Sequence, residues 1–347
     1  MSLRDAKDTA IERLLSRRRL SPLELLPWVI ALGVYFFLPQ YLTLGSQILI
    51  MVLFALSLDI TLGYAGVIIL GHAAFYGMGA YTAGLLAVHG WGDPLIGLVA
   101  AAIAAAILGL VSGIVILRTT GLALLMLGMA VALILYEAAN RLHDITGGFD
   151  GLRGMTIQPI FGYFDFDFFG KTAFLYCLAV LFLAWLFVRQ VVISPFGRSL
   201  VGIQENADRM AAIGTPVARR KLIAFVLSAA IAGIAGALSA QINQFVSLSV
   251  FSFELSGTVL VMLVLGGAGR LYGAFVGAPL YMIAQDQFAK GDPVYWLFWL
   301  GILLIAVVLF ARGGILGVVD AVREMIGRRL TGRVAVAAAD TKSSAGS

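Results

Sequence analysis

Few residues of this sequence have the type or the spacing that enzyme chemistry requires. The three histidines, His72, His89 and His143, do not have the spacing of a metal-binding motif, and the single cysteine adds no ligand to them. Residues 170–172 (Gly-Lys-Thr) imitate the end of a phosphate-binding loop, but Asp165 stands where its first glycine is required. We therefore expect no catalytic residue, no metal site, no ATP site and no cofactor in this chain.

Asp59 could do binding chemistry, because it lies within a long apolar run. A carboxylate inside a membrane span costs on the order of 3 kcal/mol and needs a partner or water. The sequence leaves two interpretations open. Asp59 is a hydrated or protonated acid near the inner interface, which we favour, or it recognises the ammonium group of a substrate.

The residues that follow Asp59 form a glycine-rich segment, and we group Asp59, Gly63, Gly66, Gly71 and His72 as candidates for a transport pathway. Small residues let membrane helices approach closely, and this is the simpler interpretation of the glycines. The functional alternative is that they interrupt a helix and expose backbone groups along a pathway. His72 is either a satisfied interfacial histidine or a gating or substrate contact.

The composition explains which elements must position these residues. With 61% hydrophobic residues, 12% charged residues and a mean hydropathy of +0.97, the chain has too little polar surface for a water-soluble globule. Since a membrane helix needs roughly 20 mostly apolar residues, we expect an all-α polytopic membrane protein. The sequence predicts about ten spans, near residues 24–40, 44–62, 72–90, 95–117, 121–140, 171–193, 222–241, 255–267, 271–288 and 295–312.

Charge predicts the orientation of these spans. Six of the 24 basic residues precede Glu24, five lie in residues 194–222 and five lie in residues 312–333. Because lysine and arginine collect on the cytoplasmic side, both termini are expected there. The acids expected on the outer side are Asp93, Asp144, Asp150, Asp165, Asp167, Glu254 and Asp292. The basic balance then indicates contact with the lipid bilayer surface, and nucleic acid is not expected as a partner.

The same reasoning divides the chain into three parts. Residues 1–20 form a basic cytoplasmic arm, residues 21–317 a single transmembrane domain, and residues 318–347 a cytoplasmic tail that is disordered at its end. A cytoplasmic loop at 194–221 interrupts the domain. Within it we expect a short helix from Ile203 to Ile213, which Gly214 ends. The loop is either a solvated segment that sets orientation or a docking element for a soluble partner.

Four motifs carry a family resemblance: LDITLGYAGVIILGHAAFYGMGAY at 58–81, TGGFDGLRG at 146–154, the stretch 194–238 that contains ENADRMAAIG, and LVLGGAGRLYGAFVGA at 263–278. Together they resemble the permease subunit of branched-chain amino acid ABC transporters. The resemblance implies a multi-pass permease of the bacterial inner membrane. It also implies three kinds of partner: a second homologous permease, two cytoplasmic ATPases and a substrate-binding protein outside.

In such importers the segment ENADRMAAIG would correspond to the coupling helix that contacts the ATPase. The residues that the resemblance assigns to coupling are Arg198, Gln204, Glu205, Asn206, Ala207, Ala211 and Gly214.

The sequence departs from the family pattern at Asp59, where asparagine is common, and at Val67 and Ile69, where polar residues are common. These changes leave urea or short amides as alternatives to branched-chain or other small amino acids. An ion-driven secondary transporter is a further alternative, but such proteins use ionisable residues near the midplane and often inverted repeats. Among the ionisable residues, only Asp59 comes close to such a midplane position. The segments LGYAG and LGGAG are alike, but they have the same expected orientation and so do not support an inverted repeat.

Overall fold

The computed structural model describes residues 25–159, 170–310 and 313–317. Across these residues the chain is built from helices, with an isolated antiparallel bridge between Leu152 and Val246. The all-α fold expected from the sequence is therefore confirmed. The basic arm, the C-terminal tail and Glu24, where the first span is expected to begin, lie outside the described residues.

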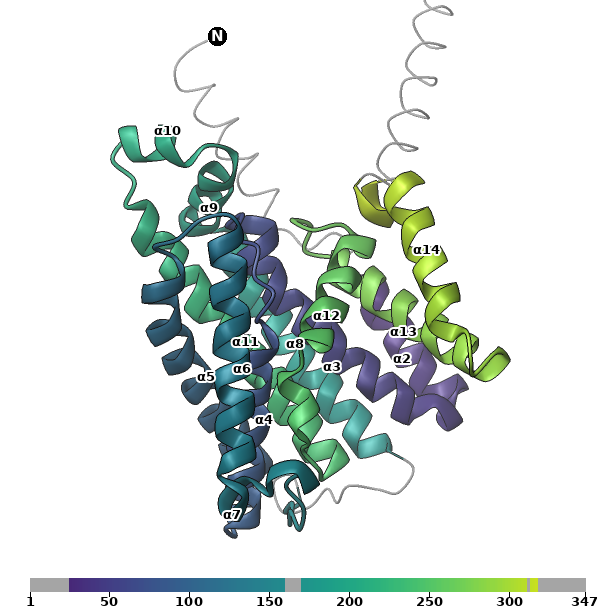
Figure 1. Cartoon of the computed structure of the whole chain (residues 1–347). Helices are drawn as coiled ribbons and strands as arrows, with labels where there is room; N and C mark the ends of the chain where they lie inside the picture. Colours follow the sequence, from purple (N-terminus) through teal and green to yellow (C-terminus); the bar gives the residue numbers. More distant parts are fainter. Residues whose placement is uncertain (1–24, 160–169, 311–312, 318–347) are drawn as a thin grey trace, which may run out of the picture.

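Each of the ten ranges expected as spans contains a helix (Figure 1). Five helical segments, at 39–64, 94–116, 122–141, 171–193 and 217–243, are long and apolar enough to cross a membrane, as the fold of a polytopic membrane protein requires. The ten helices are α2 (Leu26–Phe37), α3 (Leu42–Asp59), α4 (Ala73–Val88), α5 (Pro94–Ile116), α6 (Leu122–Arg141), α8 (Lys171–Ile193), α11 (Val217–Asn243), α12 (Phe253–Gly266), α13 (Gly273–Gly291) and α14 (Trp296–Phe310).

Short elements connect these helices. The first segment long enough to cross the membrane begins with the turn η2 (Pro39–Tyr41) and ends with the π-helical turn η3 (Ile60–Tyr64), on either side of α3. The remaining short elements are α7 (His143–Thr146), η4 (Gly148–Asp150), α9 (Pro195–Glu205), α10 (Ala207–Ala212) and η5 (Leu248–Phe251).

Helix α11 lies at the centre of the bundle and packs against α3, α4 and α5. Small residues make this packing possible. A Cβ atom at Gly79 would overlap the Gly233 carbonyl oxygen, and one at Gly236 would overlap the Tyr76 carbonyl oxygen. Close backbone approach through small residues is typical of helix pairs in membranes, where apolar burial alone gives little specificity.

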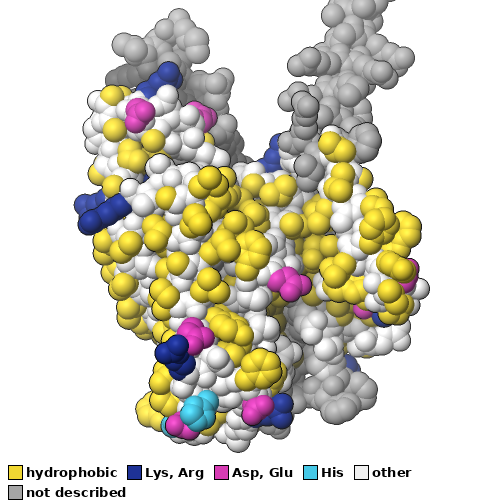
Figure 2. Space-filling view, viewed as in Figure 1, with side chains coloured by type: hydrophobic (Ala, Val, Ile, Leu, Met, Phe, Trp, Pro, Cys, Tyr) yellow, Lys and Arg dark blue, Asp and Glu magenta, His cyan; other side chains and the backbone are white. Residues whose placement is uncertain are grey.

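The surface matches a membrane environment. Hydrophobic side chains cover much of the flank of the bundle in Figure 2, and most of the visible charged side chains lie toward its two ends. Helices α9 and α10 project from one end, and α7 lies at the other (Figure 1). An acidic side chain over α12, within the apolar flank, departs from this pattern.

The single helix expected from Ile203 to Ile213 is wrong. The chain breaks at Asn206, whose φ of −158° and ψ of 100° are extended rather than helical. The Asn206 side chain instead caps α10, because its Oδ1 accepts a hydrogen bond from the Arg209 amide at 2.9 Å. Helices α9 and α10 therefore form two arms of an elbow, which we call the α9–α10 elbow.

Candidate functional site

Asp59 is buried and holds a turn in place. Its side chain is 1% exposed, and Oδ1 accepts a hydrogen bond of 2.7 Å from the backbone amide of Gly269 in the connection between α12 and α13. Within the described part of the chain, Oδ2 has no hydrogen-bond partner. The carboxylate thus links the end of α3 to a loop 210 residues further along the chain.

Gly63 makes that link possible. A Cβ atom at Gly63 would overlap both Asp59 Oδ1 and the Gly269 amide nitrogen. Gly269 has a φ of +77°, which favours glycine, and it approaches the Gly63 carbonyl in turn. The LGYAG and LGGAG motifs, whose likeness is visible in the sequence, therefore pack against each other backbone to backbone. Close packing, the simpler of the two interpretations from the sequence, therefore explains why a glycine stands at position 63.

Gly71 has a similar role against a different helix. A Cβ atom at Gly71 would overlap the backbone of Gly128 in α6. The irregular segment 65–72, which joins η3 to α4, is thereby held on α6. Non-helical backbone at membrane depth is tolerated where it is buried in protein or lines an aqueous cavity, and most of this segment is buried.

His72 belongs to a buried polar cluster that we call the polar centre, formed by Ser57, His72, Ser228 and Ser256. The Ser57 hydroxyl donates to the Phe54 carbonyl at 2.6 Å, so His72 Nε2 donates to Ser57 Oγ at 2.9 Å. The Ser228 hydroxyl donates to the Ser57 carbonyl, and Ser256 Oγ accepts from the Ala73 amide at 3.0 Å. The polar centre joins α3, α4, α11 and α12.

Gly66 connects the glycine-rich segment to the α9–α10 elbow. It has a φ of +66°, and a Cβ atom there would lie 3.0 Å from Gln204 Cγ and 3.5 Å from Gln204 Cα. A pathway candidate and a coupling candidate, assigned separately from the sequence, are thus in contact. The remaining pathway candidates do not form one cluster, because Asp59 and Gly63 face Gly269 whereas Gly71 faces α6.

The elbow is anchored to the bundle through α9. Arg220 of α11 donates from Nη1 to Ser199 Oγ at 2.6 Å, and its guanidinium lies 5.9 Å from the centre of the Phe196 ring. The inner corner of the elbow is closed by Gly202, where a Cβ atom would lie 2.9 Å from Met210 Sδ. Helix α9 is therefore fixed to α11, and α10 is fixed to α9.

The outer surface of the elbow carries most of the coupling candidates. Arg198, Glu205 and Asn206 are exposed, as is Ala211, whereas Ala207 is half-buried. Gly214 has a φ of +87° just after the end of α10, which is the positive φ that a helix-ending glycine supplies. Beside it, Ile213 is 70% exposed.

Most of the chain matches a known protein family. Residues 40–308 match the model of a family described as "Branched-chain amino acid transport system / permease component". This chain belongs to that permease family. The matched range contains the glycine motifs, the polar centre and the elbow.

Individual permeases of the family are similar over most of their length. The high-affinity branched-chain amino acid transport system permease proteins LivM of Salmonella typhimurium and Escherichia coli K12 are each 30% identical over 302 residues, which cover 79% of this chain and 69% of the relative. A probable LivM of Methanocaldococcus jannaschii is 25% identical over 313 residues, covering 76% of this chain and 89% of the relative. No solved structure matches the chain.

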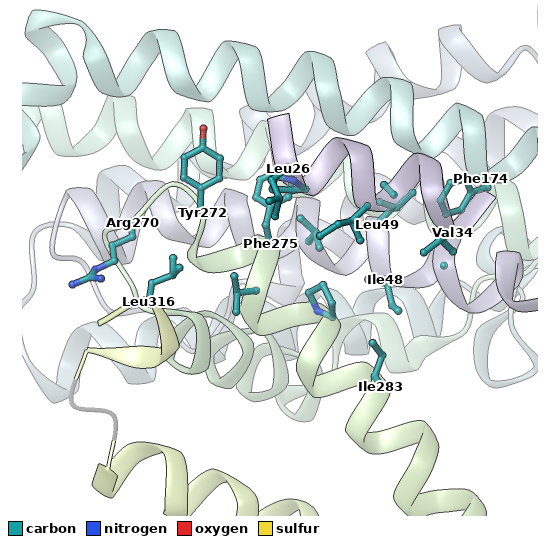
Figure 3. Close-up of a pocket in the computed structure, with 17 residues that line it drawn as sticks. Leu26, Val34, Ile48, Leu49, Phe174, Arg270, Tyr272, Phe275, Ile283 and Leu316 are labelled. Atoms are coloured by element: carbon teal, nitrogen blue, oxygen red, sulfur yellow. The ribbon is translucent and has the colours of Figure 1, made fainter. Parts of the chain in front are cut away.

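The permease also carries a large apolar groove, of about 760 Å³, between α2, α3 and α13 (Figure 3). Arg270 is the charged residue of its lining and lies at one end, while Phe174, Val34 and Ile283 lie toward the other. A zwitterionic amino acid needs polar partners for both of its charged groups. Among the described residues the groove lining offers Arg270 but no carboxylate, so it does not supply both partners and is unsuited to be the substrate site.

Sequence reasoning missed the partners of the residues that it singled out. Gly63 packs on Gly269 and Gly71 packs on Gly128. The elbow is held by Arg220. Each of these partners is distant in sequence from the residue that it contacts. The likeness of LGYAG to LGGAG was the available signal for Gly269. Nothing local indicates Gly128.

Proposed function

We propose that this permease forms one half of the membrane channel of an ABC importer for branched-chain or other small amino acids. It pairs with a second, homologous permease in the bacterial inner membrane. A substrate-binding protein delivers the amino acid outside, and two cytoplasmic ATPases supply the energy. Membership of the permease family supports the transport role, and the similar LivM proteins are named for branched-chain amino acid transport.

The contact between the α9–α10 elbow and Gly66 is the observation that best supports coupling of ATP hydrolysis to movement of the spans. An ATPase moves a permease only if its docking element is rigid and reaches the spans. The elbow meets both conditions, since Arg220 fixes α9 to α11 and Gln204 rests on the segment that leads into α4. We assign Arg198, Gln204, Glu205, Asn206, Ala207, Ala211 and Gly214 to this coupling surface, and we add Ile213.

The domain organisation follows from this role. The basic arm at 1–20, the coupling loop at 194–221 and the tail at 318–347 lie on the cytoplasmic side, where the ATPases bind. Asp59, the acid that suggested the secondary-transporter alternative, is engaged by the Gly269 amide, and the ATP dependence of uptake distinguishes that alternative from an ABC importer.

Reconstitution tests the proposal. A tagged chain is purified with the subunits that accompany it and placed in proteoliposomes with ATP on the elbow side and binding protein on the other. Uptake of labelled leucine, isoleucine and valine is expected only with hydrolysable ATP. Amino acid uptake at the same rate without ATP would contradict an ABC importer, and uptake of urea alone would contradict the substrate class.

A further inference from the structure

Glu254 lies at the surface of the bundle, about halfway between its two ends, although the sequence predicts it among the acids of the outer side. It is the second residue of α12, and twelve further residues bring that helix to its end at Gly266. At a rise of 1.5 Å per residue, Glu254 is about 18 Å from that end. A full crossing needs about 30 Å, so a helix of this length whose Gly266 end lies at one membrane surface begins inside the membrane.

Neighbouring helices give the same depth. Two residues after Glu254, Ser256 Oγ accepts from the amide of Ala73, the first residue of α4. The opposite end of α4, at Val88, is about 22 Å away along its axis. Just before α12, Phe251 stacks on Tyr81 of α4 with ring centres 5.4 Å apart. The chain thus re-enters the bundle between Val246 and Phe251 before α12 starts.

The face of α12 that carries Glu254 is only partly covered. Glu254 is exposed, and a Cβ atom at Gly257, one turn along, would have no neighbour within 4 Å. Val264, three turns along the same face, is 41% exposed. Positions three and four apart share one side of a helix, so these residues and the half-buried Val261 form a stripe that the described residues of this chain cover only in part.

A carboxylate at mid-membrane depth does not face lipid without a large cost, and such residues face the bundle interior or a water-filled cavity. The partly open stripe is therefore unsuited to hydrocarbon. The space beside Gly257, where an added Cβ would meet nothing within 4 Å, leaves room near the carboxylate for a small molecule.

We infer that the α12 stripe lines the translocation passage and that the Glu254 carboxylate binds the α-ammonium group of the amino acid as it crosses the membrane. The inference rests on the proposed function and names a substrate-binding group for it. Asp59, for which the sequence left ammonium recognition open as the less favoured alternative, is turned inward to Gly269 and is 1% exposed. A carboxylate is the side chain that pairs with an ammonium group through charge-assisted hydrogen bonds.

Thiol labelling tests whether the stripe faces water, independently of transport. Cys177 is fully buried, so the wild-type chain is an unreactive background. Glu254→Cys and Gly257→Cys in the full complex should react with a charged, membrane-impermeant methanethiosulfonate, because that reagent needs a thiolate in water. Ile107→Cys is the control, since Ile107 is exposed near the middle of α5. Labelling of the α12 positions no faster than the control would overturn the inference.

Uptake tests the ammonium contact itself. Glu254→Gln should lower ATP-driven leucine uptake by tenfold or more, with normal recovery of the complex, whereas Glu254→Asp should retain part of it. Glu137→Gln is the matched control, because Glu137 makes only an exposed ion pair with Arg141. If the wild-type complex imports no amino acid, the proposed function fails.

If the wild-type complex imports leucine and Glu254→Gln does so equally well, only the present inference fails. Loss of the second permease from the Glu254→Gln complex would also overturn it, because the carboxylate would then hold a partner cation.

Discussion

Gly63→Ala measures how much the permease depends on the contact between its two glycine motifs. The new Cβ would overlap Asp59 Oδ1 and the Gly269 amide nitrogen, and it would lie 2.7 Å from Gly269 Cα. Two of these atoms belong to backbone, so no side-chain rotation relieves the overlap. Overpacking of this kind costs about 1–3 kcal/mol, and the lost hydrogen bond to a charged acceptor costs about 1.5–3 kcal/mol.

The two costs together predict a loss of about 2.5–6 kcal/mol in the free energy of unfolding, out of a typical total of about 5–15 kcal/mol. In thermal unfolding of the purified protein, followed by circular dichroism in detergent, this corresponds to a Tm lower by at least about 5 °C. Gly33→Ala in α2 is the matched control, since a Cβ atom there meets nothing within 4 Å and alanine is the better helix former. If both variants unfold within about 1 °C of each other, the two motifs are not in contact.

Three further predictions concern Asp59, the elbow and the orientation of the chain in the membrane. Asp59→Asn should leave uptake within about tenfold of wild type, because an amide oxygen also accepts from Gly269, whereas Asp59→Ala should unfold more easily in the same thermal assay. Gly214→Val should cost about 1–2 kcal/mol at a φ of +87° and should uncouple leucine-stimulated ATP hydrolysis at normal membrane abundance; unchanged stimulation would contradict the coupling role. A reporter that fluoresces only in the cytoplasm should be bright when fused after Gly202 and dark after Phe161, and the reverse would overturn the orientation.

Hydropathy predicts the helices well because a chain in lipid must satisfy its backbone internally, which leaves the helix as the main solution for a long apolar run. Helix ends were predictable where a local rule applies, as at Gly214, whose positive φ the sequence indicated. The break at Asn206 follows a local rule too. Asparagine is a preferred cap and Asp208 suits the first turn of the next helix, but the run of small residues that follows favoured one continuous helix.

The site was less predictable because its contacts join residues far apart in sequence. The Asp59 carboxylate was assigned to water or substrate since its acceptor role toward Gly269 depends on how two loops fold together. Glu254 was assigned to the outer side because the charge distribution set the orientation of the spans. The run at 255–267 that follows it is shorter than a crossing of about 30 Å requires, which is the basis for the deeper position inferred above.

The contacts also explain how an elbow at one end of the bundle could act on a residue at its middle. Gln204 of α9 touches Gly66, three residues after Gly63, and Gly63 packs on the loop that ends α12. Helix α12 is a short element that runs from this loop to Glu254, about 18 Å away. Because a packed helix moves as a unit, a displacement of α9 that shifts the loop would also shift the carboxylate. Gly63 makes this connection tight, since it meets Gly269 backbone to backbone, while Gly66 lets Gln204 approach closely. We therefore expect the glycine motifs to matter for transmitting motion from the elbow to the passage, and not for contacting the substrate.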